Sequence, residues 1–223
     1  MIFYDAHCHK LLDQAGGFFI GLEGEPIFSD VISNNEALSI EDPSKRRFAV
    51  EYISASKKKG ARPLLKYHPR REKYSVEFVK KSISLSSPKL CIIDTLNQPF
   101  WTPKDYWEIA QEFPEIEFIF CHAGGYDILE FLKIAEFGKN ISIDFSLTQE
   151  YFGWCGERTK FPHVVECIDF AIKNQRLKRK VLFGSDEPFF SQKKALEKYA
   201  KIPDSQLFLE ENFLLLIQKI KLI

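Results

Sequence analysis

Short apolar segments alternate with longer segments of helical periodicity along most of the 223-residue chain. Segments such as 90–93 and 118–121 are continuously apolar, which is typical of strands that are covered on both faces. We predict eight strands, at residues 2–7, 27–32, 48–54, 62–67, 89–94, 116–121, 140–145 and 180–185. Helices are expected at about 73–86, 103–112, 127–137, 162–176, 192–201 and 204–220.

This alternation predicts an α/β fold in which helices cover a parallel sheet. Eight strands in 223 residues leave about 28 residues for each unit, near the lower limit for a (β/α)₈ barrel. We therefore predict a single compact (β/α)₈ TIM barrel, with residues 1–223 forming one domain. The early helices are expected to be trimmed, because residues 10–26 and 33–46 have weak helical periodicity. An open doubly wound sheet is the alternative, but no glycine-rich phosphate-binding sequence follows the first strand.

The charge balance argues against several classes of partner. Lys and Arg total 31, Asp and Glu also total 31, and the formal net charge is zero. A dedicated nucleic-acid binder usually carries a basic field, and no apolar run approaches the ~18 residues of a membrane span. We expect a small-molecule substrate, with no nucleic-acid or membrane partner. The five dispersed cysteines and the lack of a secretion signal favour a cytoplasmic protein with free thiols.

Two histidines lie two residues apart at the end of the first predicted strand, in the sequence Asp5-Ala6-His7-Cys8-His9. Side chains two apart on a strand point the same way, so His7 and His9 are expected to enter the mouth of the barrel together. A single strand histidine is usually structural, but two convergent imidazoles suit a divalent transition metal. Zinc is the commonest such partner.

Four further motifs stand at predicted strand ends: Lys66-Tyr67-His68-Pro69, Phe120-Cys121-His122-Ala123-Gly124-Gly125, Ile143-Asp144-Phe145-Ser146 and Phe183-Gly184-Ser185-Asp186-Glu187-Pro188. With the opening Asp5-x-His7-x-His9, their order and spacing resemble the amidohydrolase superfamily of metal-dependent TIM-barrel enzymes. The similarity is greatest to its amidohydrolase-related branch, called amidohydrolase 2, which contains lactonases, other hydrolases and nonoxidative decarboxylases. The resemblance covers nearly the whole chain, although residues 10–60 match only loosely.

The resemblance implies a role for each matching residue. His7 and His9 would be metal ligands, and Asp186 would bind the metal and accept a proton from its water. A bound zinc lowers the pKa of water to roughly 7. His122 would polarise the scissile carbonyl or join the ligands. For Asp186, capping of the helix after the eighth strand is the structural alternative.

One position departs from the family pattern, because Asp94 stands where the family normally has a metal-binding histidine at the end of the fifth strand. Asp94 could be an oxygen ligand, which would tolerate manganese as well as zinc. His68 could instead bind the metal from the fourth strand, and we include it among the expected ligands; a structural role ahead of the proline turn is the alternative. Third, the metal site could be degraded. Lys66, on the same face as His68, is expected to contact a substrate anion, with a metal-bridging carbamate as a minor alternative.

Substrate contacts are expected in the loops after the strands. Arg158 is the predicted substrate-binding residue of the loop after the seventh strand, and Arg70 and Arg71 are further candidates, because guanidinium groups bind carboxylates and phosphates. Aromatic residues in the same loops, such as Phe189 and Phe190, are candidates for stacking on a planar substrate or for packing the rim.

The resulting hypothesis is a metal-dependent hydrolase that cleaves a lactone or amide bond in a small, anionic substrate. A nonoxidative decarboxylase of the same branch is the nearest alternative. A TatD-like metal-dependent nuclease also opens with a similar sequence, and a barrel without metal could serve as a binding module. The apolar segment 213–217 is expected to be core or the contact of a homodimer.

Overall fold

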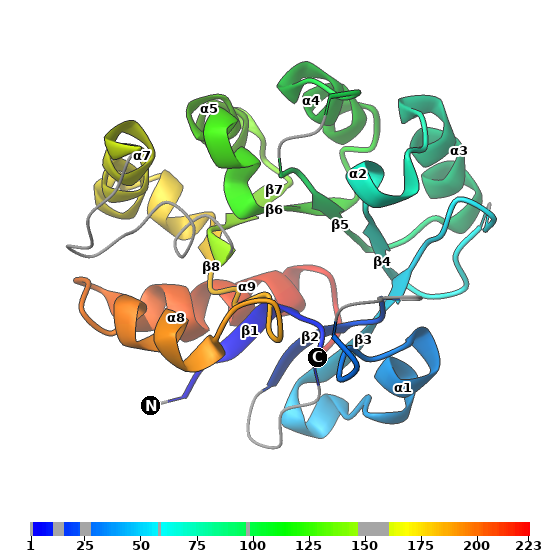
Figure 1. Ribbon diagram of the computed structural model, residues 1–223, viewed down its shortest axis with the longest axis horizontal. Helices are drawn as coiled ribbons and strands as arrows, with labels where there is room; N and C mark the ends of the chain where they lie inside the picture. Colours follow the sequence, from blue (N-terminus) through cyan, green and yellow to red (C-terminus); the bar gives the residue numbers. More distant parts are fainter. Residues whose placement is uncertain (1, 11–15, 23–27, 58, 97–98, 147–160) are drawn as a thin grey trace.

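The computed structural model describes residues 2–10, 16–22, 28–57, 59–96, 99–146 and 161–223. Its eight strands form one parallel sheet in sequential order, and helices surround the sheet (Figure 1). The strands are β1 (Tyr4–Cys8), β2 (Gly16–Ile20), β3 (Arg47–Tyr52), β4 (Leu64–Tyr67), β5 (Leu90–Asp94), β6 (Glu117–Cys121), β7 (Ile141–Asp144) and β8 (Val181–Leu182). The predicted TIM barrel is therefore confirmed.

Five of the six expected helices lie within a few residues of their predicted bounds. The last begins at residue 212 instead of 204, after a π-helical segment at Leu207–Glu211, and the short helix at residues 69–72 was not predicted. The helices are α1 (Asn34–Ser39), α2 (Pro69–Glu72), α3 (Val76–Ser86), α4 (Pro103–Glu112), α5 (Ile128–Phe137), α7 (Pro162–Lys173), α8 (Gln192–Tyr199) and α9 (Asn212–Lys219). The early helices are short, as the weak periodicity predicts. Among the described residues, none of the helices could cross a membrane.

The two ends of the sheet meet through β1 and the segment that follows β8. The amide of Ala6 donates to the carbonyl of Phe183, and the amide of Asp186 donates to the carbonyl of His7, each over 2.8 Å. These bonds join the segment after β8 to β1 and nearly close the barrel. They also place the end of β1 beside the residues that follow β8.

The second strand lies elsewhere than predicted. Residues 28–32 form a turn, and β2 is the segment Gly16–Ile20. Its two glycines look like chain breakers in the sequence, but they permit close packing against β1. A Cβ atom on Gly17, whose φ is +145°, would lie 2.1 Å from the carbonyl oxygen of Asp5. Only glycine fits there without displacing the backbone of β1.

Gly17→Ala is expected to destabilise the fold by about 3 kcal/mol, because its methyl group would collide with backbone rather than with a flexible side chain. The free energy of unfolding in urea measures the loss. Gly184→Ala is the comparison variant, since its added Cβ would meet side-chain atoms of Asp144 and His7 at 3.1 Å, a tight contact that needs a much smaller shift than the 2.1 Å contact with backbone at Gly17. Equal losses in the two variants would refute the proposed role of the close approach between β1 and β2.

A bulge in β1 directs its histidines into the mouth of the barrel. The register against β2 shifts between Asp5 and Cys8, where β1 has one residue more than its partner. Bulges of this kind redirect the side chains that follow them. Tyr4 and Ala6 accordingly belong to the apolar cluster inside the barrel, whereas His7 and His9 reach the site described below.

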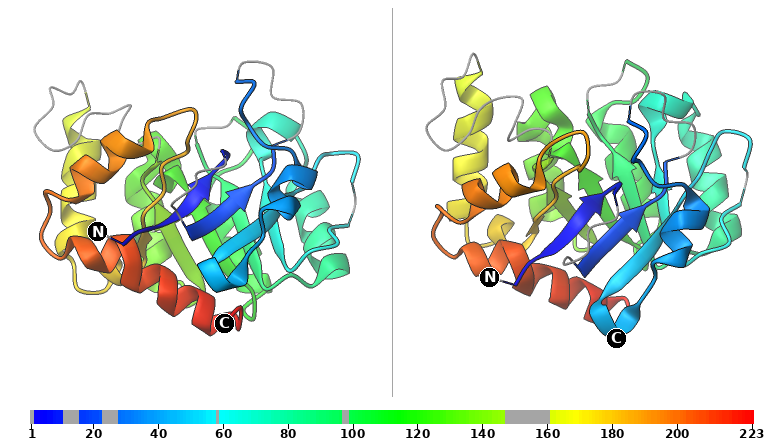
Figure 2. Two further views of the ribbon diagram at one scale, coloured as in Figure 1. Left: turned by 90° about the horizontal axis from the view of Figure 1, so that it is seen from below. Right: turned by 60° about the horizontal axis from the view of Figure 1, so that its bottom comes forward.

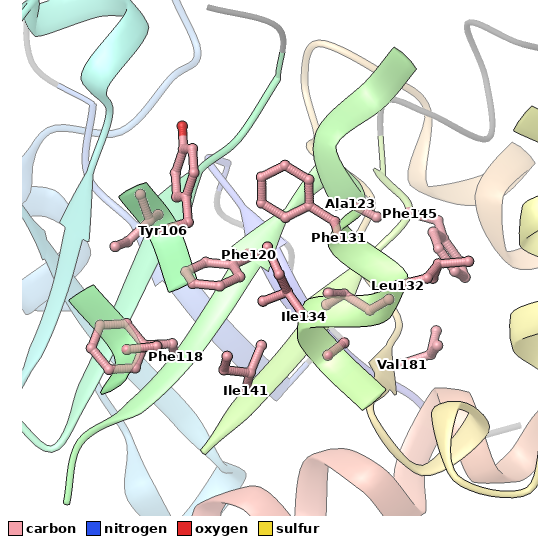
Figure 3. Packing of buried hydrophobic residues seen from close by; sticks show 14 of the residues in the cluster. Tyr106, Phe118, Phe120, Ala123, Phe131, Leu132, Ile134, Ile141, Phe145 and Val181 are labelled. Atoms are coloured by element: carbon pink, nitrogen blue, oxygen red, sulfur yellow. The ribbon is translucent and has the colours of Figure 1, made fainter. Parts of the chain in front are cut away.

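Apolar side chains fill the barrel and the layer around it. The outer layer joins the strands to the helices, for example where Phe120 of β6 packs against Phe131 of α5 and Tyr106 of α4 (Figure 3). Helix α9 crosses beneath β1 and β2 (Figure 2). Its Phe213 stacks on Tyr4 at a ring distance of 5.0 Å. Phe213 is therefore part of the core, as predicted for segment 213–217.

Candidate metal centre

The mouth of the barrel holds a cavity of about 590 Å³ at the carboxyl ends of the strands. Active sites of TIM-barrel enzymes lie at this end. The cavity is lined by residues of β1, β4 and β5 and of the segments that follow β1, β2, β4, β5, β6 and β8. They are His7, His9, Leu22, Phe28, Lys66, His68, Arg70, Arg71, Asp94, Leu96, His122, Asp186, Phe189 and Phe190.

Three predicted ligands meet at one point of this cavity. His9 Nε2 lies 3.2 Å from His7 Nε2, and Asp186 Oδ1 lies 3.4 Å from His7 Nε2 and 3.5 Å from His9 Nε2. All three residues are buried. The three atoms therefore form a nearly equilateral triangle of two imidazole nitrogens and one carboxylate oxygen.

The neighbours of the two Nδ1 atoms leave both Nε2 atoms as acceptors that can bind a metal, and Lys66 Nζ also lies 3.4 Å from His7 Nε2. His9 Nδ1 lies 3.0 Å from the carbonyl oxygen of Ile20, which can only accept, so Nδ1 carries the proton. His7 Nδ1 lies 3.5 Å from a carboxylate oxygen of Asp144 and 3.3 Å from the hydroxyl of Ser146. Acceptors behind metal-binding histidines fix their tautomer and orientation in this way.

The spacing of the triangle fits a tetrahedral metal ion. Ligand atoms 2.0–2.1 Å from a tetrahedral zinc are about 3.3–3.4 Å apart, and the three separations here are 3.2, 3.4 and 3.5 Å. Three protein ligands with one further position are typical of catalytic zinc. His122 also offers a ligand atom within 4.8 Å of those of His7 and Asp186. The donor set thus suits zinc, and its oxygen also suits manganese.

The backbone after β8 is fixed by a buried carboxylate of β1. Asp5 accepts hydrogen bonds from the amide and the hydroxyl of Ser185 and from the side chain of Gln192. Burial raises the pKa of Asp5 to about 6, although these donors oppose the shift. Asp186 follows directly, with φ of +62°. The pairing of Asp5 with Ser185 therefore helps to place Asp186 opposite His7.

His122 occupies a polar position at the end of β6. Its Nδ1 lies 2.9 Å from the hydroxyl of Ser146, and its Nε2 lies 3.1 Å from Asp94 Oδ2. Ser146 donates its proton to Asp144, so its oxygen accepts from His122. Both ring nitrogens thus face acceptors. Burial lowers the pKa of His122, but the hydrogen bond and charge of Asp94 outweigh it and raise that pKa above its usual value.

Asp94 faces three basic side chains. Besides His122, its carboxylate lies 3.5 Å from His68 Nε2 and 3.6 Å from Arg70 Nε. Burial raises the pKa of Asp94, but the charges of His68, His122 and Arg70 lower it well below its usual range. Asp94 is therefore ionised and paired with these groups.

His68, an expected ligand, does not join the triangle. It caps the N-terminus of α2, where its ring accepts from the amide of Arg71, and its Nε2 faces Asp94. The proline turn after β4 explains this position, since Pro69 begins the short helix that His68 caps. The structure thus brings together His7, His9 and Asp186 and holds His68 beside Asp94.

The predicted substrate contacts have different positions. Lys66 is fully buried on β4, where its Nζ lies 3.4 Å from His7 Nε2 and 3.2 Å from the sulfur of Cys121. Burial lowers the pKa of Lys66, but Cys121 and Asp94 outweigh it and the pKa is raised. Arg158 lies outside the described residues. The fifth histidine of the chain, His163, is exposed on α7 and does not line the cavity.

Asp144 and Ser146 are further functional candidates, whose roles the sequence alone does not predict. Asp144 accepts from the amides of His122 and Ser146 and faces His7. Burial raises its pKa, but His7, His122 and Ser146 outweigh it, so the pKa falls below the usual range. Two polar residues two apart at a strand end, as in the His7–His9 pair, are the signal that could have found them.

Comparison with known proteins supports the same fold. A family model described as Amidohydrolase matches residues 89–212, more than half of the chain. No curated protein matches the sequence significantly. An uncharacterized TIM-barrel protein from Bordetella bronchiseptica has a TM-score of 0.62 at 15% identity, covering 92% of this chain and 78% of its own.

Two further solved structures are similar over nearly their whole length. An apo structure of an Agrobacterium tumefaciens protein has a TM-score of 0.58 at 10% identity, covering 97% of this chain and 94% of its own. A probable 2-pyrone-4,6-dicarboxylic acid hydrolase from Acinetobacter baumannii, with citric acid bound, has a TM-score of 0.54 at 13% identity, covering 99% and 100%. At these identities the likeness concerns the fold alone.

Proposed function

Since the chain belongs to the amidohydrolase family, we propose that it is a metal-dependent hydrolase that cleaves a lactone or amide bond in a small anionic substrate. The observation that carries the proposal is the triangle of His7, His9 and Asp186, whose three separations of 3.2–3.5 Å suit a tetrahedral metal ion. We propose zinc as the metal, with manganese as the alternative. When bound, the metal would acidify a water molecule and polarise a carbonyl group.

Asp186 would serve as the general base. Burial raises the pKa of this carboxyl above its usual value, although the charges of His7, His122 and Lys66 oppose the shift. A carboxylate with a raised pKa is a stronger base for the water that attacks the carbonyl. Its position at the cavity wall lets it take the proton and return it to the leaving group.

His122 would donate a hydrogen bond to the carbonyl oxygen of the substrate. Its Nε2–H faces Asp94 at 3.1 Å and lines the same cavity. We expect that proton to be shared with the substrate oxygen as negative charge develops there. The buried ammonium of Lys66, beside His7, adds positive charge to the same region. Arg158 remains a proposed substrate contact. The four described cysteines are free thiols, which supports our proposal of a cytoplasmic enzyme.

The test is an activity screen on tag-free protein, depleted of metal and then restored with zinc or manganese. The screen contains lactones, amides, carboxylated aromatic compounds and single-stranded DNA. We expect hydrolysis of a lactone or amide that disappears on depletion and returns with metal. Release of carbon dioxide would favour a decarboxylase instead, and cleavage of DNA would favour a nuclease. Turnover that survives metal depletion would contradict the proposed metal dependence.

A further inference from the structure

The cavity has two chemically different walls. Lys66, His68 and Arg70 enter it from β4 and the adjoining α2. An aromatic pair stands on another part of the lining, where Phe28 and Phe189 meet edge to face at 4.9 Å. Phe189 also packs against His9 at a ring distance of 5.8 Å. The proposed reaction centre therefore lies beside an apolar wall of the cavity, and basic side chains form another wall.

Of these three basic residues, Arg70 has the most donors left for a ligand. Lys66 is held by His7 and Cys121, and His68 by Asp94 and the capped end of α2. Among the described residues, the one partner of Arg70 is Asp94, which faces its Nε at 3.6 Å. The Arg70 side chain is 44% exposed. Its two terminal amino groups are therefore free to bind a ligand in the cavity.

Asp94 is not paired with Arg70 alone. The same carboxylate also faces His122 and His68, so its contact with Arg70 is one of three. Its Oδ1, the atom nearest Arg70, accepts no hydrogen bond from the described residues. Asp94 thus contacts Arg70 at the Nε atom of the guanidinium and leaves the two terminal amino groups of Arg70 available to a ligand.

We propose that Arg70 binds a carboxylate group of the substrate, so that the pocket takes small carboxylic acids with a flat apolar body. This inference rests on the proposed function, which gives the position of the reaction centre, and it adds the class of substrate. The guanidinium fork matches a carboxylate through two parallel hydrogen bonds. The apolar body of the ligand would lie against Phe28 and Phe189, beside His9 and the other two residues of the triangle.

A singly charged carboxylate suits this cavity better than a phosphate does. Two acidic residues, Asp94 and Asp186, line the same space and would repel a dianion. Arg70 is partly exposed, so its attraction for an anion is expected to weaken as salt screens the charge. These features distinguish the site from a phosphate-binding pocket with several buried donors.

Binding of benzoate and of its neutral analogue benzamide tests the inference without any turnover. Nuclear magnetic resonance titration of the full chain measures both dissociation constants. We expect benzoate to bind about 10-fold more tightly than benzamide, because one charge-assisted pair is lost in the amide. Arg70→Gln should remove the difference, and Arg70→Lys should retain part of it. Arg179→Gln is the control, since it removes the same charge from an exposed residue before β8 that does not line the cavity.

The outcomes separate this inference from the proposed function. Equal binding of the two probes by the wild-type protein, or equal losses in Arg70→Gln and Arg179→Gln, would overturn the role of Arg70. Tighter binding of phenyl phosphate than of benzoate would overturn the proposed substrate class. Because the titration requires no catalysis, selective benzoate binding in an inactive protein would support the subsite and leave only the hydrolase proposal refuted.

Discussion

Asp186→Asn is expected to lower kcat by about 10⁴-fold, the upper range for loss of a general base. The amide cannot take a proton from water, and it also replaces the one charged atom of the triangle, which lies 3.4 Å from His7 and 3.5 Å from His9. Steady-state kinetics on the lactone or amide identified by the screen, at saturating zinc, measures the change.

The control for this variant is Asp127→Asn, the same substitution at an exposed residue before α5 that makes no side-chain capping bond. It should keep the wild-type rate. Circular dichroism of Asp186→Asn shows whether the barrel still folds. A folded Asp186→Asn protein that retains more than about a tenth of kcat would exclude Asp186 as the general base.

His122→Asn is expected to reduce kcat by about 10²- to 10³-fold with a smaller effect on KM, because the lost hydrogen bond would strengthen as charge develops on the substrate oxygen. The variant also removes one hydrogen-bond partner from Asp94 and one from Ser146. We therefore expect a loss of about 1–3 kcal/mol in the free energy of unfolding.

His163→Asn is the matched control for this second variant, since His163 is exposed on α7. It should change neither the kinetics nor the unfolding midpoint. Thermal melting followed by circular dichroism separates a loss of fold from a loss of chemistry. If His122→Asn is folded and raises KM while kcat stays unchanged, then His122 contributes binding only and its proposed role at the carbonyl oxygen is wrong.

Much of the fold could be predicted from the sequence because local pattern and burial agree in the central strands. Strands such as β5 and β6 are buried on both faces and read as continuous apolar runs. The exception was β2, where Gly16 and Gly17 weaken the local signal for a strand. Their function there is steric and depends on β1, a contact that sequence periodicity does not reveal.

The candidate site was predictable where it depends on strand ends. His7, His9 and Asp186 follow strands that meet at one end of a barrel, so their proximity follows from the topology. The sequence permits three roles for Asp94, because the role of this residue depends on hydrogen bonds across the barrel. His122 and Arg70, which lie close to it, are 28 and 24 residues away in the sequence.

Metal content tests the central claim most directly. Tag-free protein purified without chelator is analysed by plasma mass spectrometry, with Asp186→Asn and Asp127→Asn beside the wild-type chain. We expect about one equivalent of zinc or manganese in the wild-type and Asp127→Asn proteins, and a strongly reduced content in Asp186→Asn. A wild-type protein that contains no metal, and takes up neither zinc nor manganese on equilibrium dialysis, would contradict the assignment of His7, His9 and Asp186 as metal ligands.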